Sequence, residues 1–253
     1  MEKQFHVNTK EASIHCKLYS DGARTMSRVI LYIHGFGGHM DNRAAARFAE
    51  LVLSKYKDIG ILTFNLPCHG DDVRRVLSLE DCDRYISAVT DYVSTELGAK
   101  ELFVYATSFG GYLFLRHIHL HGNRFLRSAL RCPAVNMHEA MLKNIMTEEN
   151  RQQLRKGRAA SVGFDRKVQI DQAFLTSLAE NDLMQFDFTP YSESVIIIQG
   201  TKDEIVDIDA VFRFADQNEM MLFTVEGADH RFMDPRKMDE AIKTILDFFE
   251  LGT

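Results

Sequence analysis

Two hydrophobic patterns alternate along most of the chain. Short apolar runs rich in β-branched residues are typical of strands buried in a parallel sheet, and segments that repeat apolar residues every three to four positions are typical of amphipathic helices. Strands are expected at residues 28–34, 59–64, 101–107, 128–132, 195–199 and 221–225. Helices are expected at residues 41–56, 79–97, 109–121, 208–216 and 237–249, with Asp41 capping the first. This alternation predicts an α/β fold, with helices flanking a mostly parallel central sheet.

The beginning and the middle of the chain depart from this alternation. Residues 4–8 and 13–18 predict two short strands joined by a polar turn, which we expect to form an antiparallel hairpin at the sheet edge. From 136 to 189 no strand is evident and apolar residues recur at helical spacing. We therefore predict a single domain over 1–253 with a helical cap inserted at about 136–189, in which Phe174 and Met141 wall the substrate pocket.

A candidate nucleophile stands where the strand at 101–107 meets the following helix. The sequence A-T-S-F-G-G at 106–111 places Ser108 on a sharp strand-to-helix turn, which exposes a serine hydroxyl at the edge of a sheet. Such a turn requires small residues two before and two after the serine, and here they are Ala106 and Gly110. The alternative interpretation is a serine that only caps a helix.

A glycine-rich turn, H-G-F-G-G at 34–38, directly follows the strand at 28–34. A turn in this position can direct a backbone N–H group into the site, where it stabilises an oxyanion together with the N–H group after the nucleophile. The expected donors are therefore the amides of Phe36 and Phe109. The turn matches neither a phosphate-binding loop, which continues with Lys and Ser or Thr, nor a G-x-G-x-x-G dinucleotide fingerprint.

A nucleophilic serine also needs a base and a carboxylate that orients the base. Asp203 lies just beyond the predicted strand at 195–199, and His230 lies just beyond the strand at 221–225. Asp207 and Asp209 are alternative carboxylates, but they are further from the strand end, toward the next helix. The predicted catalytic residues are thus Ser108, His230 and Asp203.

These motifs resemble those of α/β-hydrolase esterases and lipases of the monoacylglycerol lipase, cinnamoyl esterase and serine-aminopeptidase-like group. The resemblance rests on residues 34–38, 65–70, 106–111, 199–203 and 227–232, which occur in the family's order. Ala106, in place of the usual glycine, and the segment 65–68 depart from its pattern. The resemblance implies the α/β-hydrolase fold, a carboxylic-ester hydrolase without a cofactor, and a cap between the sixth and seventh strands.

The sequence therefore predicts a serine hydrolase that cleaves small-molecule carboxylic esters through an acyl-enzyme intermediate. An amidase or peptidase with the same triad and a non-catalytic binding protein on a hydrolase scaffold are the alternatives. A dehalogenase or epoxide hydrolase would need Asp at the position of Ser108.

Charge and composition limit the classes of binding partner and the expected cellular location. Lys and Arg total 30 against 36 Asp and Glu, and this net charge of −6 argues against nucleic-acid binding. No apolar stretch reaches the roughly 18 residues of a membrane span, and the N-terminus lacks the features of a signal peptide, so a cytoplasmic protein is expected. The oligomeric state is left open.

The sequence predicts no metal site. The four cysteines are widely spaced, without a C-x-x-C pair. His117 and His121 lie one helical turn apart without a third ligand in sequence, and we expect them at a solvated helix end. The basic residues at 151–167 are expected on a solvated helix face, with attraction of an acidic substrate as the alternative.

Overall fold

The computed structural model describes residues 1–22 and 26–251 of the chain. An eight-stranded sheet forms its centre, in the order β1-β2-β4-β3-β5-β6-β9-β10. Strands β1 (Glu2–Asn8) and β2 (Ser13–Tyr19) form the antiparallel hairpin expected at the edge, and β2 pairs antiparallel with β4 (Ile59–Phe64).

The other strand pairs of the sheet are parallel, as the alternating pattern predicts. These strands are β3 (Arg28–Ile33), β4, β5 (Glu101–Thr107), β6 (Arg127–Arg131), β9 (Val195–Gly200) and β10 (Met221–Val225). The chain passes from β3 to β4 on one side and then to β5 on the other side of β3. This reversal opens a crevice at the carboxyl ends of β3 and β5, where open α/β sheets bind ligands.

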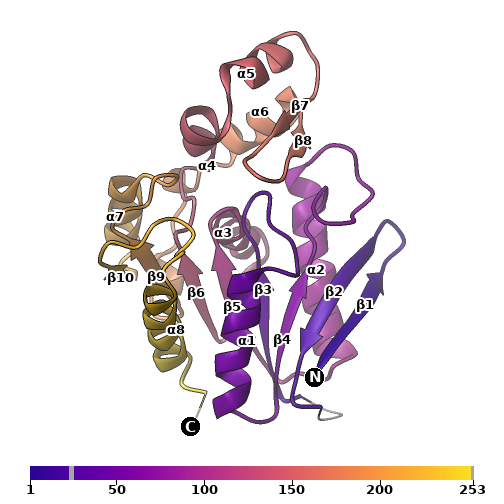
Figure 1. The fold of residues 1–253 in the computed structure, drawn as a ribbon, viewed down its shortest axis with the longest axis vertical. Helices are drawn as coiled ribbons and strands as arrows, with labels where there is room; N and C mark the ends of the chain where they lie inside the picture. The colour runs from indigo at the N-terminus through magenta and orange to yellow at the C-terminus, as the bar shows by residue number, and fades with distance from the viewer. Residues whose placement is uncertain (23–25, 252–253) are drawn as a thin grey trace.

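Helices cover both faces of the sheet (Figure 1). Apolar residues of α1 (Arg43–Lys55) and α8 (Pro235–Phe249) belong to one core cluster, and those of α2 (Leu79–Thr95), α3 (Phe109–His121) and α7 (Ile208–Gln217) belong to the other. The prediction that Asp41 caps α1 was wrong. Asn42 is the cap, because its side chain accepts the Ala45 amide at 2.8 Å, whereas Asp41 pairs with Lys17.

Between β6 and β9 the chain leaves the sheet. Residues 136–189 are called the cap below. Residues 137–180 lie at the top of Figure 1, beyond the carboxyl ends of the strands. The end of the cap then returns along α3, where Phe186 stacks on His119 with ring centroids 4.1 Å apart. The cap contains α4 (Met137–Ala140), a π-helical turn (Met141–Ile145), α5 (Glu148–Arg155), β7 (Ala160–Val162), β8 (Val168–Ile170), α6 (Gln172–Glu180) and a short 3-10 turn (Leu183–Gln185). A second 3-10 turn (Thr189–Tyr191) begins at its last residue.

The expectation that the cap contains helices alone was wrong, because β7 and β8 pair as an antiparallel hairpin. Each strand has three residues and buries only its first and third side chains. Such a segment is too short to show the alternation that identifies a strand in a sequence. No described helix is long and apolar enough to cross a membrane.

Candidate active site

Ser108 occupies a strained turn between β5 and α3. Its φ of 53° and ψ of −119° place a non-glycine residue in a conformation that L-amino acids rarely adopt. The end of β6 holds this turn, because the Ser108 amide donates to the Arg131 carbonyl at 3.0 Å. Gly110 is required here, since a Cβ atom on it would lie 2.3 Å from the carbonyl oxygen of Ile33. The turn therefore needs the small residue that its sequence provides.

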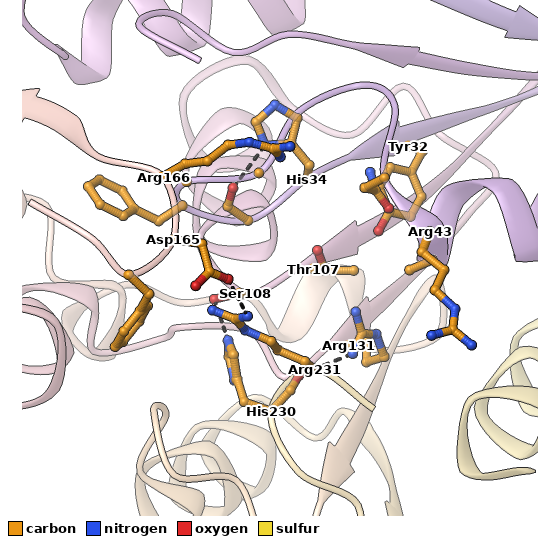
Figure 2. A pocket seen from close by; sticks show the side chains of 17 residues that line it. Tyr32, His34, Arg43, Thr107, Ser108, Arg131, Asp165, Arg166, His230 and Arg231 are labelled. Carbon is orange, nitrogen blue, oxygen red and sulfur yellow. Dashed lines mark hydrogen bonds and ion pairs between the residues drawn. The ribbon is translucent and has the colours of Figure 1, made fainter. Parts of the chain in front are cut away.

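The structure brings the three predicted catalytic side chains together. His230 Nε2 lies 2.9 Å from Ser108 Oγ, an interaction drawn as a dashed line in Figure 2. His230 Nδ1 lies 2.9 Å from each carboxylate oxygen of Asp203. Because the Asp203 carboxylate accepts a hydrogen bond from His230 Nδ1, the Nε2 atom of the same ring faces the Ser108 hydroxyl.

The Asp203 carboxylate is fully buried and held by several donors. The amides of Ile205 and Val206 donate to Oδ1 at 2.9 and 2.8 Å, and Gln199 Nε2 donates to Oδ2 at 3.0 Å. Burial by itself raises the pKa of Asp203, but the hydrogen bond and charge of His230, with the Val206 amide, bring that pKa below its ordinary value. The carboxylate is therefore ionised at neutral pH.

The rival carboxylates have other partners. Asp207 caps α7 by accepting the amide of Asp209 at 3.1 Å. Asp229, beside the histidine in sequence, accepts the amide of Met233 at 3.1 Å. Asp203 is thus the carboxylate that meets the ring of His230.

Two buried histidines hold the turn at 34–38. His69 Nε2 accepts the Gly37 amide at 3.0 Å, and His34 Nδ1 lies 2.8 Å from the Gly35 carbonyl oxygen. Burial lowers the pKa of His69 to about 4 and holds the pKa of His34 well below its ordinary value. Both rings are therefore neutral at physiological pH, which leaves one nitrogen of His69 free to accept the backbone amide.

The turn at 34–38 packs against Ser108 and Phe109. A Cβ atom on Gly35 would lie 3.1 Å from Ser108 Cβ, so the turn packs directly against the serine. The rings of Phe36 and Phe109 pack edge to face with centroids 5.8 Å apart. Within residues 1–22 and 26–251, neither the Phe36 amide nor the Phe109 amide donates to another group.

Ser108 and His230 open into a pocket of about 510 Å³. The turn between β7 and β8 contributes Phe164, Asp165 and Arg166 to its wall, so the cap reaches the site through its hairpin (Figure 2). The expectation that Phe174 and Met141 wall this pocket was wrong. Both are buried in the apolar interface between the cap and the sheet domain, and neither lines the pocket.

Arg131 is a site residue that the sequence analysis did not identify. It is the last residue of β6, is only 5% exposed, and lines the pocket. Its Nε donates to the Tyr105 hydroxyl at 3.0 Å and one terminal nitrogen donates to the His230 carbonyl at 3.1 Å. The sequence contained one signal for this residue, an arginine at the end of a predicted buried strand. Buried charged residues are rare and usually paired, so such an arginine indicates a site residue.

The expected solvated helix end holds for His121, which is exposed at the end of α3, but not for His117. His117 is buried, and its Nδ1 lies 2.8 Å from one carboxylate oxygen of Asp83 on α2. His121 Nε2 lies 2.8 Å from the other oxygen. Asp83 is 34 residues from His117, so the sequence could not indicate this pairing.

Comparison with known proteins identifies the family of the chain. A model of the alpha/beta hydrolase family matches residues 30–242, and the chain belongs to that family. Comparison with curated protein sequences found no match.

Solved structures of low sequence identity share the fold over nearly the whole chain. A putative hydrolase from Agrobacterium vitis S4 has a TM-score of 0.76 and 17% identity, with 99% of each chain covered. Est1E from Butyrivibrio proteoclasticus, with ferulic acid bound, has a TM-score of 0.75 and 17% identity, with 97% of this chain and 99% of that chain covered. The esterase domain of a Rhodothermus marinus protein has a TM-score of 0.71 and 13% identity, with both chains fully covered.

Proposed function

We propose that the protein is a serine hydrolase that cleaves carboxylic esters of small molecules through an acyl-enzyme intermediate. The observation that carries this proposal is the continuous contact from Ser108 Oγ through the His230 ring to the Asp203 carboxylate, with 2.9 Å at each step. A serine hydroxyl is a weak nucleophile unless a base is positioned to take its proton.

In the proposed reaction, Ser108 Oγ attacks the ester carbonyl while His230 Nε2 accepts the hydroxyl proton. The buried carboxylate of Asp203 stabilises the imidazolium and fixes its orientation. The amides of Phe36 and Phe109 donate to the oxyanion, and His230 returns the proton to the departing alcohol. A water molecule, deprotonated by His230, then hydrolyses the acyl-enzyme and regenerates Ser108.

Two further points favour esters. Two proteins that share this fold are Est1E, which is described with ferulic acid bound, and the Rhodothermus marinus domain, which is described as an esterase domain. The cap turn residues 164–166 line the same pocket as Ser108, and its volume of about 510 Å³ is sufficient for a small-molecule ester.

A fluorophosphonate probe tests the nucleophile. We expect the probe to label Ser108 alone, because only a serine activated by a base should react. Labelling should disappear in Ser108→Ala and persist in Ser161→Ala, which removes an exposed serine of the cap. Mass spectrometry that places the label on another serine, or finds none on the folded protein, would overturn the proposal.

Substrate comparison separates esters from amides. We expect turnover of p-nitrophenyl butyrate to exceed that of amino-acid p-nitroanilides by orders of magnitude. A preference for the anilides would assign the same triad to an amidase or peptidase.

A further inference from the structure

The pocket at Ser108 is lined by an excess of positive charge. Four arginines line it: Arg43, Arg131, Arg166 and Arg231. Among the described residues, Asp165 is the single carboxylate of the lining, and it pairs with Arg231 at 3.0 Å. Because the whole chain carries a net charge of −6, its composition does not explain this accumulation of guanidinium groups. The pocket itself concentrates positive charge.

Arg131 is the most informative of these groups because it is buried without a carboxylate partner. Its hydrogen bonds go to a neutral hydroxyl, on Tyr105, and to the His230 carbonyl, and it stacks on the ring of Phe232 at 4.9 Å. A buried guanidinium is costly unless an anion compensates it. Within residues 1–22 and 26–251 no carboxylate contacts Arg131, so the described protein does not provide that anion.

The amino-terminal end of α1 lies on the same wall. Asn42, Arg43 and Ala44 line the pocket at the start of this 13-residue helix. The first turn of α1 contains no acidic residue, and the Asn42 side chain satisfies the amide of Ala45. The amides of Arg43 and Ala44 have no acceptor in the part of the chain described, and a helix end of this kind attracts anions.

The arrangement of these groups defines a subsite beside the catalytic residues. Figure 2 shows Arg43 and Arg131 on the side of the pocket that also carries Tyr32 and Thr107, whose hydroxyls can donate hydrogen bonds. Arg166 lies on the opposite side, on the cap turn. Burial and, to a lesser extent, the charge of Arg166 lower the pKa of His39. His39 is therefore neutral at physiological pH.

We infer that the wall formed by Arg43, Arg131 and the start of α1 is an anion subsite, and that the substrate is an ester that also carries a carboxylate or phosphate group. This inference rests on the proposed esterase function and deepens it. Nε and one terminal nitrogen of Arg131 already donate to Tyr105 and His230, and the second terminal nitrogen can donate to an oxygen of either anion. Binding the anion would compensate a charge that the protein itself leaves unpaired.

Matched esters test the preference and distinguish the two anions. The leaving-group series is 4-acetoxybenzoate, 4-acetoxyphenyl phosphate and the neutral 4-acetoxybenzamide. The acyl series compares the 4-nitrophenyl monoester of adipic acid with neutral 4-nitrophenyl hexanoate. In at least one series we expect kcat/KM for an anionic ester to exceed that of its neutral partner by about 10- to 100-fold, the usual effect of a hydrogen bond to a charged group.

Arg43 is the residue to change, because its side chain is exposed, whereas Arg131 supports the backbone of His230. We expect Arg43→Gln to lower the ratio of anionic to neutral kcat/KM by about 10-fold. The matched control is Arg158→Gln, which removes one exposed positive charge of the cap outside the pocket and should leave the ratio unchanged. A ratio near one in the wild type, or an equal ratio in wild type and Arg43→Gln, would overturn the anion subsite.

Binding to Ser108→Ala tests the subsite without any turnover. We expect monomethyl adipate to bind about 10-fold more tightly than dimethyl adipate by calorimetry, and Arg43→Gln in the same background to remove the difference. Equal affinities would contradict the subsite even if the protein proved to be an active esterase. Preferential binding of the anion without ester cleavage or fluorophosphonate labelling would support the subsite and refute the proposed function.

Discussion

The ring of Phe174 packs edge to face against Phe109, with centroids 6.3 Å apart. Phe174 belongs to α6 of the cap, and Phe109 is the first residue of α3, directly after Ser108. The cap therefore rests on the residue next to the proposed nucleophile. Phe164 of the cap hairpin is instead 45% exposed and lines the pocket.

This difference predicts two separate effects of truncating cap phenylalanines. Phe174→Ala should destabilise the protein by about 3–5 kcal/mol, because it removes a buried aromatic ring. Phe164→Ala should have little effect on stability but should change the relative kcat/KM for acetate, butyrate, octanoate and feruloyl esters by about 10- to 200-fold. Denaturant unfolding and the ester series measure the two effects. Uniform changes across all four esters would mean that Phe164 does not determine selectivity.

Replacing the carboxylates one at a time tests which acid serves His230. We expect Asp203→Asn to lower kcat by about 10⁴-fold, since an amide at this position favours the wrong histidine tautomer. Asp207→Asn should change kcat little, because Asp207 caps α7 and asparagine is also a good cap. The opposite result would reassign the acid and leave Ser108 and His230 in their proposed roles.

Gly110→Ala should disrupt the turn that carries Ser108. The added Cβ atom would lie 2.3 Å from the backbone oxygen of Ile33, which cannot move without displacing β3. We expect a loss of at least about 3 kcal/mol in unfolding free energy, together with a loss of turnover. Gly98→Ala is the control, because Gly98, unlike Gly110, has open space around it. Its φ of +67° means that only backbone strain of about 1–2 kcal/mol is expected. Equal effects of the two substitutions would show that the close packing at Gly110 is unimportant.

The buried neutral His69 predicts that stability decreases on mild acidification. Its pKa is about 4 in the folded protein and 6.5 in its ordinary range, so between these pH values the unfolded chain binds a proton that the folded chain does not. This group therefore contributes a decrease of up to about 3 kcal/mol in unfolding free energy from pH 6.5 to pH 4, and none above pH 6.5. We expect His69→Gln to be less stable at pH 7 but to lose less stability on acidification. Urea unfolding at several pH values measures both effects, and parallel curves for the two proteins would contradict this prediction.

Local sequence patterns were sufficient to predict most of the sheet and its adjoining helices. The predicted strand at 59–64 coincides with β4, and the predicted helix at 109–121 coincides with α3. These elements are long or apolar enough to show a periodicity, and the buried strands read as continuous apolar runs because both of their faces are covered. The β7–β8 hairpin was missed because three-residue strands carry no such period.

The sequence by itself determined the identity of the candidate triad, because each residue follows a predicted strand and such strand ends meet at one edge of a parallel sheet. Only the tertiary structure decided what surrounds that triad. The cap turn contacts the segment that contains His230 through the pair Asp165–Arg231, whose residues are 66 positions apart in the sequence. Arg131 contacts His230, which is 99 positions away. Contacts of this kind depend on how helices and loops pack, and a local pattern of polar and apolar residues does not contain that information.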